Sequence, residues 1–432
     1  MSYRPKVLAL APYCDGTDVG EAWCAFQWVN ELSKEADVTL LSLERPGRTP
    51  LSGQLENTHV ISRPEPEWAR THERLNAMAK LSYRTYFKWA KKQISDMLAG
   101  GESFDVAHQF SPIALRFPSP LKHFDIPYVL GPLGGSLSTP DAFKSECETA
   151  AWYTHLRGID SARLRFDPFL KSSYGRASAV LGVAPYVQDL LQYCNVKCFE
   201  VMSELGIAGV KAPKSSQFNR GGIRLLHVGR GVRTKGLRDL IRALVQVKDV
   251  DGLHLDVAGK GPEMPVCEKL AIDLGVSHLV TFHGQISRAG VDKLYEQADV
   301  FAFPSFREPS GSVVYEALSH GVPTIVADRG GPGFVVDDTC GFRVAVTDPE
   351  TFSHEIANAI RTLASMPQLR QRLSEGAIQK MQTIALWPSK IASLLDLYQS
   401  IENQRNERKE IPCPSKPKSL QLHQAAGTGS SS

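Results

Sequence analysis

The stretch that decides the fold is FPSFREPSGSVVYEALSHGVP, residues 303–323. The apolar residues that lead into it predict a buried strand. Pro309 and Gly311 then interrupt regular structure, so a helix is expected to begin near Ser312. Gly321 would end that helix as its C-terminal glycine. A strand, a glycine-containing loop and a helix in this order form the repeating unit of parallel α/β proteins.

The start of this predicted helix is a candidate anion site. The first amides of a helix have no partner within it and can point at a phosphate. Two carboxylates, one in the loop and one in the helix, are expected to face the same ligand at different depths. The candidate ligand-binding residues of this segment are Glu308, Ser310, Gly311, Ser312, Val313 and Glu316.

A second segment, LLHVGRGVRTKG at residues 225–236, predicts cations beside the same ligand. A strand is expected to end at Val228, and the glycine-rich loop that starts at Gly229 carries Arg230 and Lys235. Ligands of parallel α/β folds bind at the carboxyl ends of the strands, so both segments are expected to line one crevice. Two cations there would offset the charge of a departing nucleotide diphosphate.

Short apolar runs alternate with helical patterns along the rest of the chain, and this alternation starts twice. Two Rossmann-like domains with parallel sheets are therefore expected, joined by a polar linker. The predicted boundaries are 1–210 for the first domain, 211–222 for the linker, 223–386 for the second domain, 387–405 for a helix and 406–432 for a disordered tail.

The composition argues against several classes of protein. The 432 residues include 49 Lys and Arg against 46 Asp and Glu, a balance that speaks against a nucleic-acid binder. No uninterrupted apolar run reaches the roughly 18 residues of a membrane-spanning helix. Residues 7–11 are interpreted as a first strand rather than a signal peptide. The eight cysteines form no Cys-x-x-Cys pair, so reduced thiols in a cytoplasmic protein are expected.

In this order, the motifs resemble those of glycosyltransferase family 4. The family combines a Gly-Arg-x4-Lys-Gly loop with Glu-x7-Glu and Glu-Ala-x3-Gly-x-Pro motifs. This chain has GRGVRTKG at residues 229–236, Glu308 followed by Glu316, and EALSHGVP at residues 316–323. The resemblance implies a GT-B fold, in which two Rossmann-like domains with parallel sheets face each other across a cleft. It also implies a C-terminal helix that crosses back to the first domain.

The resemblance further implies a retaining glycosyltransferase of the hexosyltransferase type. It would move a sugar from a nucleotide-sugar donor to a hydroxyl of a glycan or lipid-linked acceptor, in cell-surface or exopolysaccharide biosynthesis. Arg230 and Lys235 would hold the diphosphate. Glu308 would bind the donor sugar, and Glu316 would bind the ribose. No metal ion and no cofactor are expected, because the nucleotide-sugar is a substrate.

Three features of the first domain extend the resemblance. Gly20, ahead of the first helix, matches the glycine loop that faces donor and acceptor. His108 ends a strand and is a candidate catalytic residue, with a structural role as the alternative. Gly134 and Gly135 belong to a Gly-Pro-x-Gly-Gly loop of one subset of the family and are expected on the acceptor side.

Residues 63–92 combine basic and aromatic side chains. This stretch predicts either a solvated helix face with its rings packed inward or peripheral contact with the inner face of an anionic membrane. Its basic residues include Arg70, Arg74, Lys80, Arg84, Lys88, Lys91 and Lys92, and its aromatic residues are Trp68, Tyr83, Tyr86, Phe87 and Trp89.

The predicted helix of residues 387–405 is amphipathic. One face is expected to pack on the first domain, with Lys390 and Gln399 outside. The apolar residues of the packed face are Ile391, Leu394, Leu395 and Tyr398.

Two other functions stay open on the sequence alone. A nucleotide-sugar epimerase would bind the same kind of donor but would need no acceptor. A non-catalytic sugar-nucleotide-binding partner of another transferase would be expected to lack the basic pair or the glutamates, and this chain has both.

Overall fold

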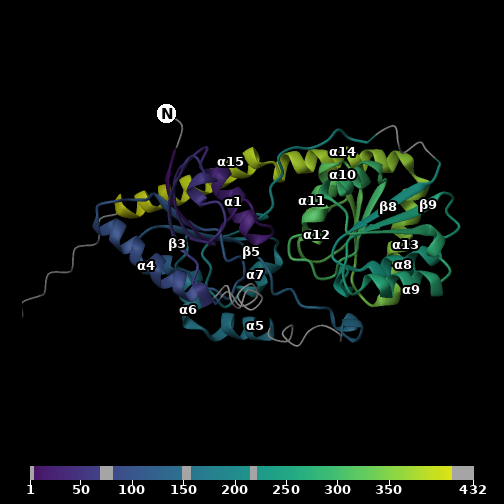
Figure 1. Cartoon of the computed structure of the whole chain (residues 1–432), viewed down its shortest axis with the longest axis horizontal. Coiled ribbons are helices and arrows are strands. Elements are labelled where there is room, and N and C mark those ends of the chain that lie inside the picture. The colour runs from purple at the N-terminus through teal and green to yellow at the C-terminus, as the bar shows by residue number, and fades with distance from the viewer. Residues whose placement is uncertain (1–3, 69–80, 148–156, 215–220, 411–432) are drawn as a thin grey trace, which may run out of the picture.

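The chain forms two α/β domains that lie side by side and are bridged by a long C-terminal helix (Figure 1). The computed structural model describes residues 4–68, 81–147, 157–214 and 221–410. Each domain is built around one parallel sheet, which confirms the expected fold class.

The first domain has a seven-stranded sheet in the order β3-β2-β1-β4-β5-β6-β7. Strand β1 is buried at every position after its first residue, as apolar strands are when helices cover both faces of a sheet. The strands are β1 (Lys6–Tyr13), β2 (Asp37–Glu44), β3 (Thr58–Pro64), β4 (Val106–Gln109), β5 (Tyr128–Leu133), β6 (Ala179–Gly182) and β7 (Phe199–Val201). The α-helices described here are α1 (Glu21–Leu32), α4 (Tyr83–Ala99), α5 (Arg157–Phe166), α6 (Pro168–Arg176) and α7 (Tyr186–Leu190).

The second domain has a six-stranded sheet in the order β10-β9-β8-β11-β12-β13. Its strands are β8 (Ile223–Val228), β9 (Leu253–Ala258), β10 (Val280–Gly284), β11 (Val300–Phe303), β12 (Thr324–Ala327) and β13 (Gly341–Val344). Its helices are α8 (Leu237–Gln246), α9 (Met264–Asp273), α10 (Arg288–Gln297), α11 (Ser312–Ser319), α12 (Gly330–Val335), α13 (Pro349–Ser365) and α14 (Pro367–Ile384).

Helix α15 (Trp387–Glu410) crosses back and packs on the first domain, as predicted. The ring of Trp387 meets that of Trp28 edge to face, with 5.1 Å between the centroids. Gln399 is exposed and Leu395 is half-buried. The helix continues past the predicted end at residue 405, and the tail from 411 lies outside the described residues. The other residues of the predicted face, Ile391, Leu394 and Tyr398, are buried.

Lys390 corrects the prediction for this helix. It was expected outside, but its side chain is buried, with Nζ 5.0 Å from the ring centroid of Trp28. The ammonium donates a hydrogen bond to the Ser203 carbonyl at 2.7 Å. Burial lowers the pKa of Lys390 to about 7, against the attraction of the Glu204 carboxylate. The side chain can be buried because the Ser203 carbonyl accepts a hydrogen bond from it.

Helix α4 places most of the described aromatic residues of the stretch 63–92, whereas Trp68, ahead of the helix, is 44% exposed. Tyr83 and Tyr86 are buried, and Phe87 and Trp89 are half-buried, so these rings pack inward. The predicted residues Arg70, Arg74 and Lys80 lie outside the described residues. The basic residues on the exposed face of the helix are Arg84, Lys88, Lys91 and Lys92.

One part of the predicted first domain packs elsewhere. Phe143, at the end of the short helix η3 (Asp141–Phe143), is fully buried in the hydrophobic core of the second domain. The predicted division at residue 210 leaves this contact out, because no local pattern marks which domain covers an isolated aromatic ring.

Candidate active site

The loops that follow the strands of the two sheets meet between the domains. A Cβ built on Gly134, after β5, would lie 3.8 Å from Pro309, and one on Gly330, after β12, would lie 3.0 Å from Leu137. Parallel α/β proteins bind their ligands at this edge of the sheet, so the junction is the candidate active site.

Lys235 and Glu308 lie at its centre. Lys235 ends the short helix η7 (Arg233–Lys235), and its ammonium forms an ion pair with the Glu308 carboxylate, the two side chains being 11% and 17% exposed. The Ser305 hydroxyl donates a hydrogen bond to the Thr234 carbonyl at 3.0 Å, which ties the two loops together. The fold thus brings into contact two predicted residues that lie 73 positions apart in the sequence.

The N-terminus of helix α11 lies beside this ion pair. Gly311 caps the helix with a φ of +86°, a conformation that favours glycine. Its amide donates a hydrogen bond to Glu308 Oε1 at 3.3 Å. Ser312 is exposed and Val313 is half-buried. The loop carboxylate therefore occupies the position in which helix-terminal amides hold anions.

Ser310 contacts a residue that the sequence did not suggest. The Ser310 hydroxyl donates a hydrogen bond to the carboxylate of Glu204, which is buried where the chain passes between the domains. Burial raises the pKa of the Glu204 carboxyl, although the Ser310 hydrogen bond and Lys390 oppose this shift. Glu204 lies on a short connecting segment without periodicity, so no local signal marks it.

Glu316 is held by two residues that sequence reasoning also missed. An Arg288 guanidinium nitrogen lies 2.7 Å from Glu316 Oε1, and the Tyr295 hydroxyl donates to Oε2 at 3.3 Å. Arg230 is exposed on the loop after β8, and Gly229 packs against the ring of Phe303. Arg288 is the first residue of helix α10, so only the tertiary structure shows that its side chain reaches α11.

His108 lies inside the first domain and has no exposed surface. It is completely buried on β4, with Nδ1 2.5 Å from the Tyr398 hydroxyl and Nε2 2.8 Å from the Gly131 carbonyl oxygen. Burial lowers the pKa of His108 to about 3, against the hydrogen bond to Gly131. The expectation of a catalytic His108 is therefore corrected, because both ring nitrogens are engaged by the protein and the residue joins β4 to α15.

The predicted glycines of the first domain differ in their surroundings. Gly20 has a φ of +65° at the start of α1, and a Cβ there would meet no atom within 4 Å. Gly134 faces Pro309 of the second domain. Gly135 has a φ of +97°, and its amide donates a hydrogen bond to the Tyr186 hydroxyl at 3.1 Å. Gly134 thus lies at the junction, beside the loop that carries Glu308.

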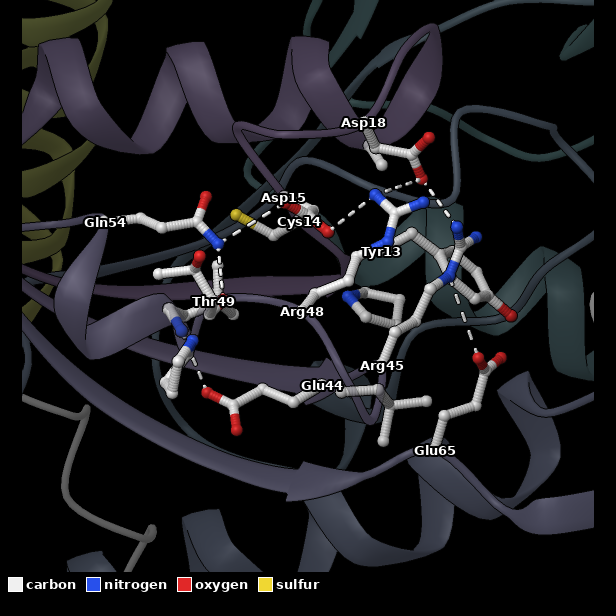
Figure 2. A pocket seen from close by; sticks show the side chains of 15 residues that line it. Tyr13, Cys14, Asp15, Asp18, Glu44, Arg45, Arg48, Thr49, Gln54 and Glu65 are labelled. Atoms are coloured by element: carbon white, nitrogen blue, oxygen red, sulfur yellow. Dashed lines mark hydrogen bonds and ion pairs between the residues drawn. The ribbon is translucent and has the colours of Figure 1, made fainter. Parts of the chain in front are cut away.

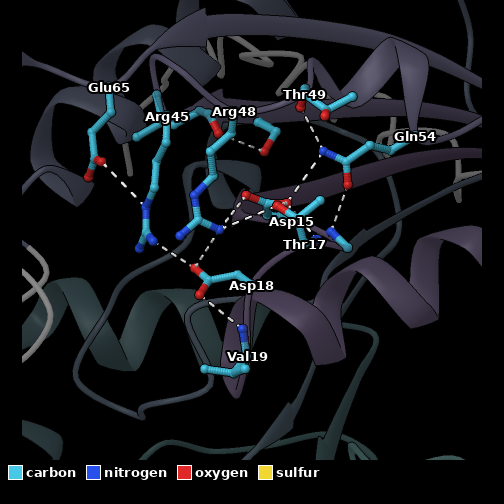
Figure 3. A network of polar contacts seen from close by, with 12 residues as sticks. Asp15, Thr17, Asp18, Val19, Arg45, Arg48, Thr49, Gln54 and Glu65 are labelled. Carbon is cyan, nitrogen blue, oxygen red and sulfur yellow. Dashed lines mark hydrogen bonds and ion pairs between the residues drawn. The ribbon is translucent and has the colours of Figure 1, made fainter.

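The first domain holds a polar pocket at the carboxyl ends of β1, β2 and β3 (Figure 2). Arg45 and Arg48 point into it from the loop after β2, toward the loop between β1 and α1 (Figure 3). Arg45 pairs with Asp18 at 2.6 Å, and Arg48 pairs with Asp15 at 3.0 Å. Glu65 lies 3.8 Å from Arg45. Sequence reasoning missed both arginines, although two arginines after a buried strand are a usable signal.

Asp15 anchors this network. Burial acts to raise the pKa of its carboxyl, but hydrogen bonds from Thr17, Arg48 and Gln54 outweigh burial and hold the pKa below its usual value.

Within the described ranges, no helix is long and apolar enough to cross a membrane, and no group of three or more His, Cys, Asp or Glu side chains could hold a metal ion.

Comparison with known protein families finds a match in the second domain. Residues 211–380 match the family model of glycosyl transferases group 1. The lipopolysaccharide core biosynthesis glycosyltransferase LpsD of Rhizobium meliloti is 35% identical over 164 residues, which are 36% of this chain and 43% of the relative. The D-inositol 3-phosphate glycosyltransferase of Thermomonospora curvata is 31% identical over 185 residues, which are 40% of this chain and 42% of the relative. The chain thus spans less than half the length of these curated relatives.

Solved structures extend the likeness to nearly the whole chain. Sucrose-phosphate synthase from Thermosynechococcus elongatus superposes with a TM-score of 0.60 at 18% identity, covering 93% of this chain and all of that one. HepE from Anabaena, in complex with UDP, superposes with a TM-score of 0.60 at 17% identity, and the match covers 92% of this chain and 100% of HepE. At such identities the likeness shows the fold alone. The chain therefore has a GT-B fold, and its residues 211–380 match glycosyl transferases group 1.

Proposed function

We propose that this protein is a retaining glycosyltransferase that moves a sugar from a nucleotide-diphosphate-sugar to a hydroxyl of a glycan or lipid-linked acceptor. The observation that carries the proposal is the Lys235–Glu308 ion pair beside the N-terminus of α11. A cation and the amides at a helix N-terminus suit a departing diphosphate, and a carboxylate suits sugar hydroxyls. Anabaena HepE, which shares this fold, has been solved in complex with UDP and with UDP-glucose, and this supports a nucleotide-sugar as donor.

Each group has a separate part in the proposed reaction. Lys235, with Arg230 from the same loop, stabilises the charge that develops on the leaving diphosphate. Glu308 accepts hydrogen bonds from the donor sugar, and Glu316 accepts those of the ribose. The acceptor hydroxyl attacks on the face from which the diphosphate leaves and passes its proton to the departing phosphate, so the anomeric configuration is retained. No metal ion enters this scheme, so activity should persist in a chelating buffer.

A screen of sugar nucleotides against glycan and lipid-linked acceptors tests the proposal. Proton NMR of the fresh product from an α-linked donor should show an α linkage, and a β linkage would refute retention. Conversion of the donor sugar without acceptor would favour an epimerase. Binding of sugar nucleotides without turnover, across the whole acceptor panel, would favour a non-catalytic binding partner.

We also propose that the acceptor binds in the polar pocket of the first domain. Among the described lining residues, Arg45 and Arg48 stand against four carboxylates, those of Asp15, Asp18, Glu44 and Glu65. Both arginines are already paired with these carboxylates, which disfavours a second anion and favours neutral hydroxyl groups.

The substitution Asp18→Asn tests the acceptor pocket. We expect it to raise the KM for the acceptor about tenfold, since a charge-assisted hydrogen bond is worth about 1.5–3 kcal/mol. The affinity for the nucleoside diphosphate should stay unchanged, because that ligand binds the second domain. Equal acceptor KM values for the variant and the wild type would remove this pocket from the proposal.

We further propose peripheral contact with the cytoplasmic face of a membrane. The exposed face of α4 is basic, and its neighbours α5 and α6 expose two rings: Phe166 is 71% and Phe169 is 55% exposed. Arg165 lies 5.2 Å from the Phe166 ring, and Lys122 lies 3.7 Å from the Phe169 ring. Exposed rings beside basic side chains suit anionic headgroups, which fits a surface-polysaccharide enzyme with a lipid-linked acceptor.

A further inference from the structure

Residues 136–147, here called the bridging segment, leave the first domain after β5 and run beneath the second domain (Figure 1). Phe143 anchors them, with no exposed surface. Its ring lies 4.5 Å from that of Phe306 and 5.8 Å from that of Phe352, between centroids. A first-domain connection thus supplies a core residue to the second domain.

Glu146 adds an ion pair to this anchor. Its carboxylate lies 2.5 Å from the Arg233 guanidinium and 2.9 Å from that of Arg242. Arg233 is 5% exposed and also pairs with the fully buried Asp239 at 2.6 Å. The guanidinium of Arg233 therefore forms one ion pair with a carboxylate of its own domain and one with a carboxylate of the bridging segment.

A third contact reaches the loop of Glu308. The Arg307 guanidinium donates a hydrogen bond to Thr139 Oγ1 at 2.8 Å. The contacts of the bridging segment thus fall on both sides of the candidate site. Arg233 lies in the same short helix as Lys235, and Phe306 and Arg307 directly precede Glu308.

We propose that the bridging segment positions the donor site, with Phe143 and Glu146 holding the Lys235 turn and the Glu308 loop in register. The inference rests on the proposed function, because it assigns a donor phosphate to Lys235. The two loops follow different strands, β8 and β11, and within the second domain the Ser305–Thr234 hydrogen bond and the Lys235–Glu308 ion pair join them. The buried ring and the shared ion pair contact both loops at once. Displacing a catalytic group by about 1 Å can cost about 10²-fold in rate.

The substitutions Phe143→Ala and Glu146→Gln test this role in the full chain. Each substitution should weaken the binding of UDP about tenfold. Binding is measured by calorimetry, with GDP and ADP as further probes. Each should also lower kcat/KM about 10–100-fold. Asp141→Asn and Lys144→Gln are matched controls from the same segment, because their side chains are 91% and 66% exposed. Phe143→Leu, which keeps an apolar side chain in the core, should restore most of the affinity.

A double-mutant cycle separates positioning from general damage. If Phe143 acts through Lys235, adding Phe143→Ala to Lys235→Ala should cost little further UDP affinity. Additive losses would overturn the proposal, as would wild-type affinity and turnover in folded Phe143→Ala and Glu146→Gln variants. If Phe143→Ala fails to fold, Glu146→Gln takes its place in the cycle. A wild-type chain that binds none of the three diphosphates would instead refute the proposed function.

Discussion

Lys235 is the side chain on which the proposed activity depends most. Replacing Lys235 or Arg230 with Ala should lower kcat about 10²–10³-fold, because the lost attraction belongs mainly to the transition state. The thermal midpoint should change little. Lys248→Ala, on an exposed side chain of the second domain, is the control and should have wild-type turnover. Normal kcat in both Lys235→Ala and Arg230→Ala would remove these cations from the mechanism.

His108 makes a prediction about stability rather than catalysis. Its pKa is about 3 in the folded chain and near 6.5 when unfolded, so the unfolded state binds the proton first as the pH falls. The stability from a neutral His108 is complete above pH 6.5 and is lost as the pH falls toward 3. This linkage amounts to about 2 kcal/mol between pH 7 and pH 5.

The substitution His108→Gln should therefore flatten the pH dependence of unfolding measured with urea. The variant should be less stable than the wild type at pH 7, since the hydrogen bonds to Tyr398 and Gly131 are altered. Its kcat should stay within a few-fold of the wild type. A large loss of kcat with an unchanged pH dependence of stability would return His108 to the active site.

At the scale of elements, helix α15 is expected to decide whether the first domain is stable. Ending the chain at Leu386 would expose the surface that α15 covers, where several large apolar side chains contribute about 1.5–3 kcal/mol each. That truncation should unfold or aggregate. A chain ending at Gln404 keeps Ile401, the last buried apolar residue of the helix among those described, and should stay active. A soluble, active chain ending at Leu386 would contradict this role.

For the whole molecule, the exposed rings of the first domain predict membrane binding. Phe166→Ser combined with Phe169→Ser should reduce flotation with vesicles of phosphatidylglycerol and phosphatidylcholine about tenfold. The remaining binding should weaken as salt screens the basic face of α4. Ile272→Ser, on a residue of the second domain that is 65% exposed, is the control. Equal flotation of the wild type with purely zwitterionic vesicles would argue against an electrostatic contact.

The sequence by itself determined the architecture of this protein. Continuous apolar strands, glycine loops and helical periodicity are local patterns, because burial on both faces and helix termination depend on neighbouring residues. They sufficed for two parallel α/β domains and for the apolar face of the crossing helix. The Lys235 and Glu308 loops were also expected together, since parallel strands present their carboxyl ends at one edge.

Only the tertiary structure decided which side chains meet across the molecule. His108 and Tyr398 are 290 residues apart, and Glu146 and Arg233 are 87 apart. Lys390 is buried because the carbonyl of the distant residue Ser203 accepts its hydrogen bond, and Phe143 belongs to the core of the second domain. Such pairings depend on how whole elements pack, since a buried polar group needs a partner that the local sequence does not specify.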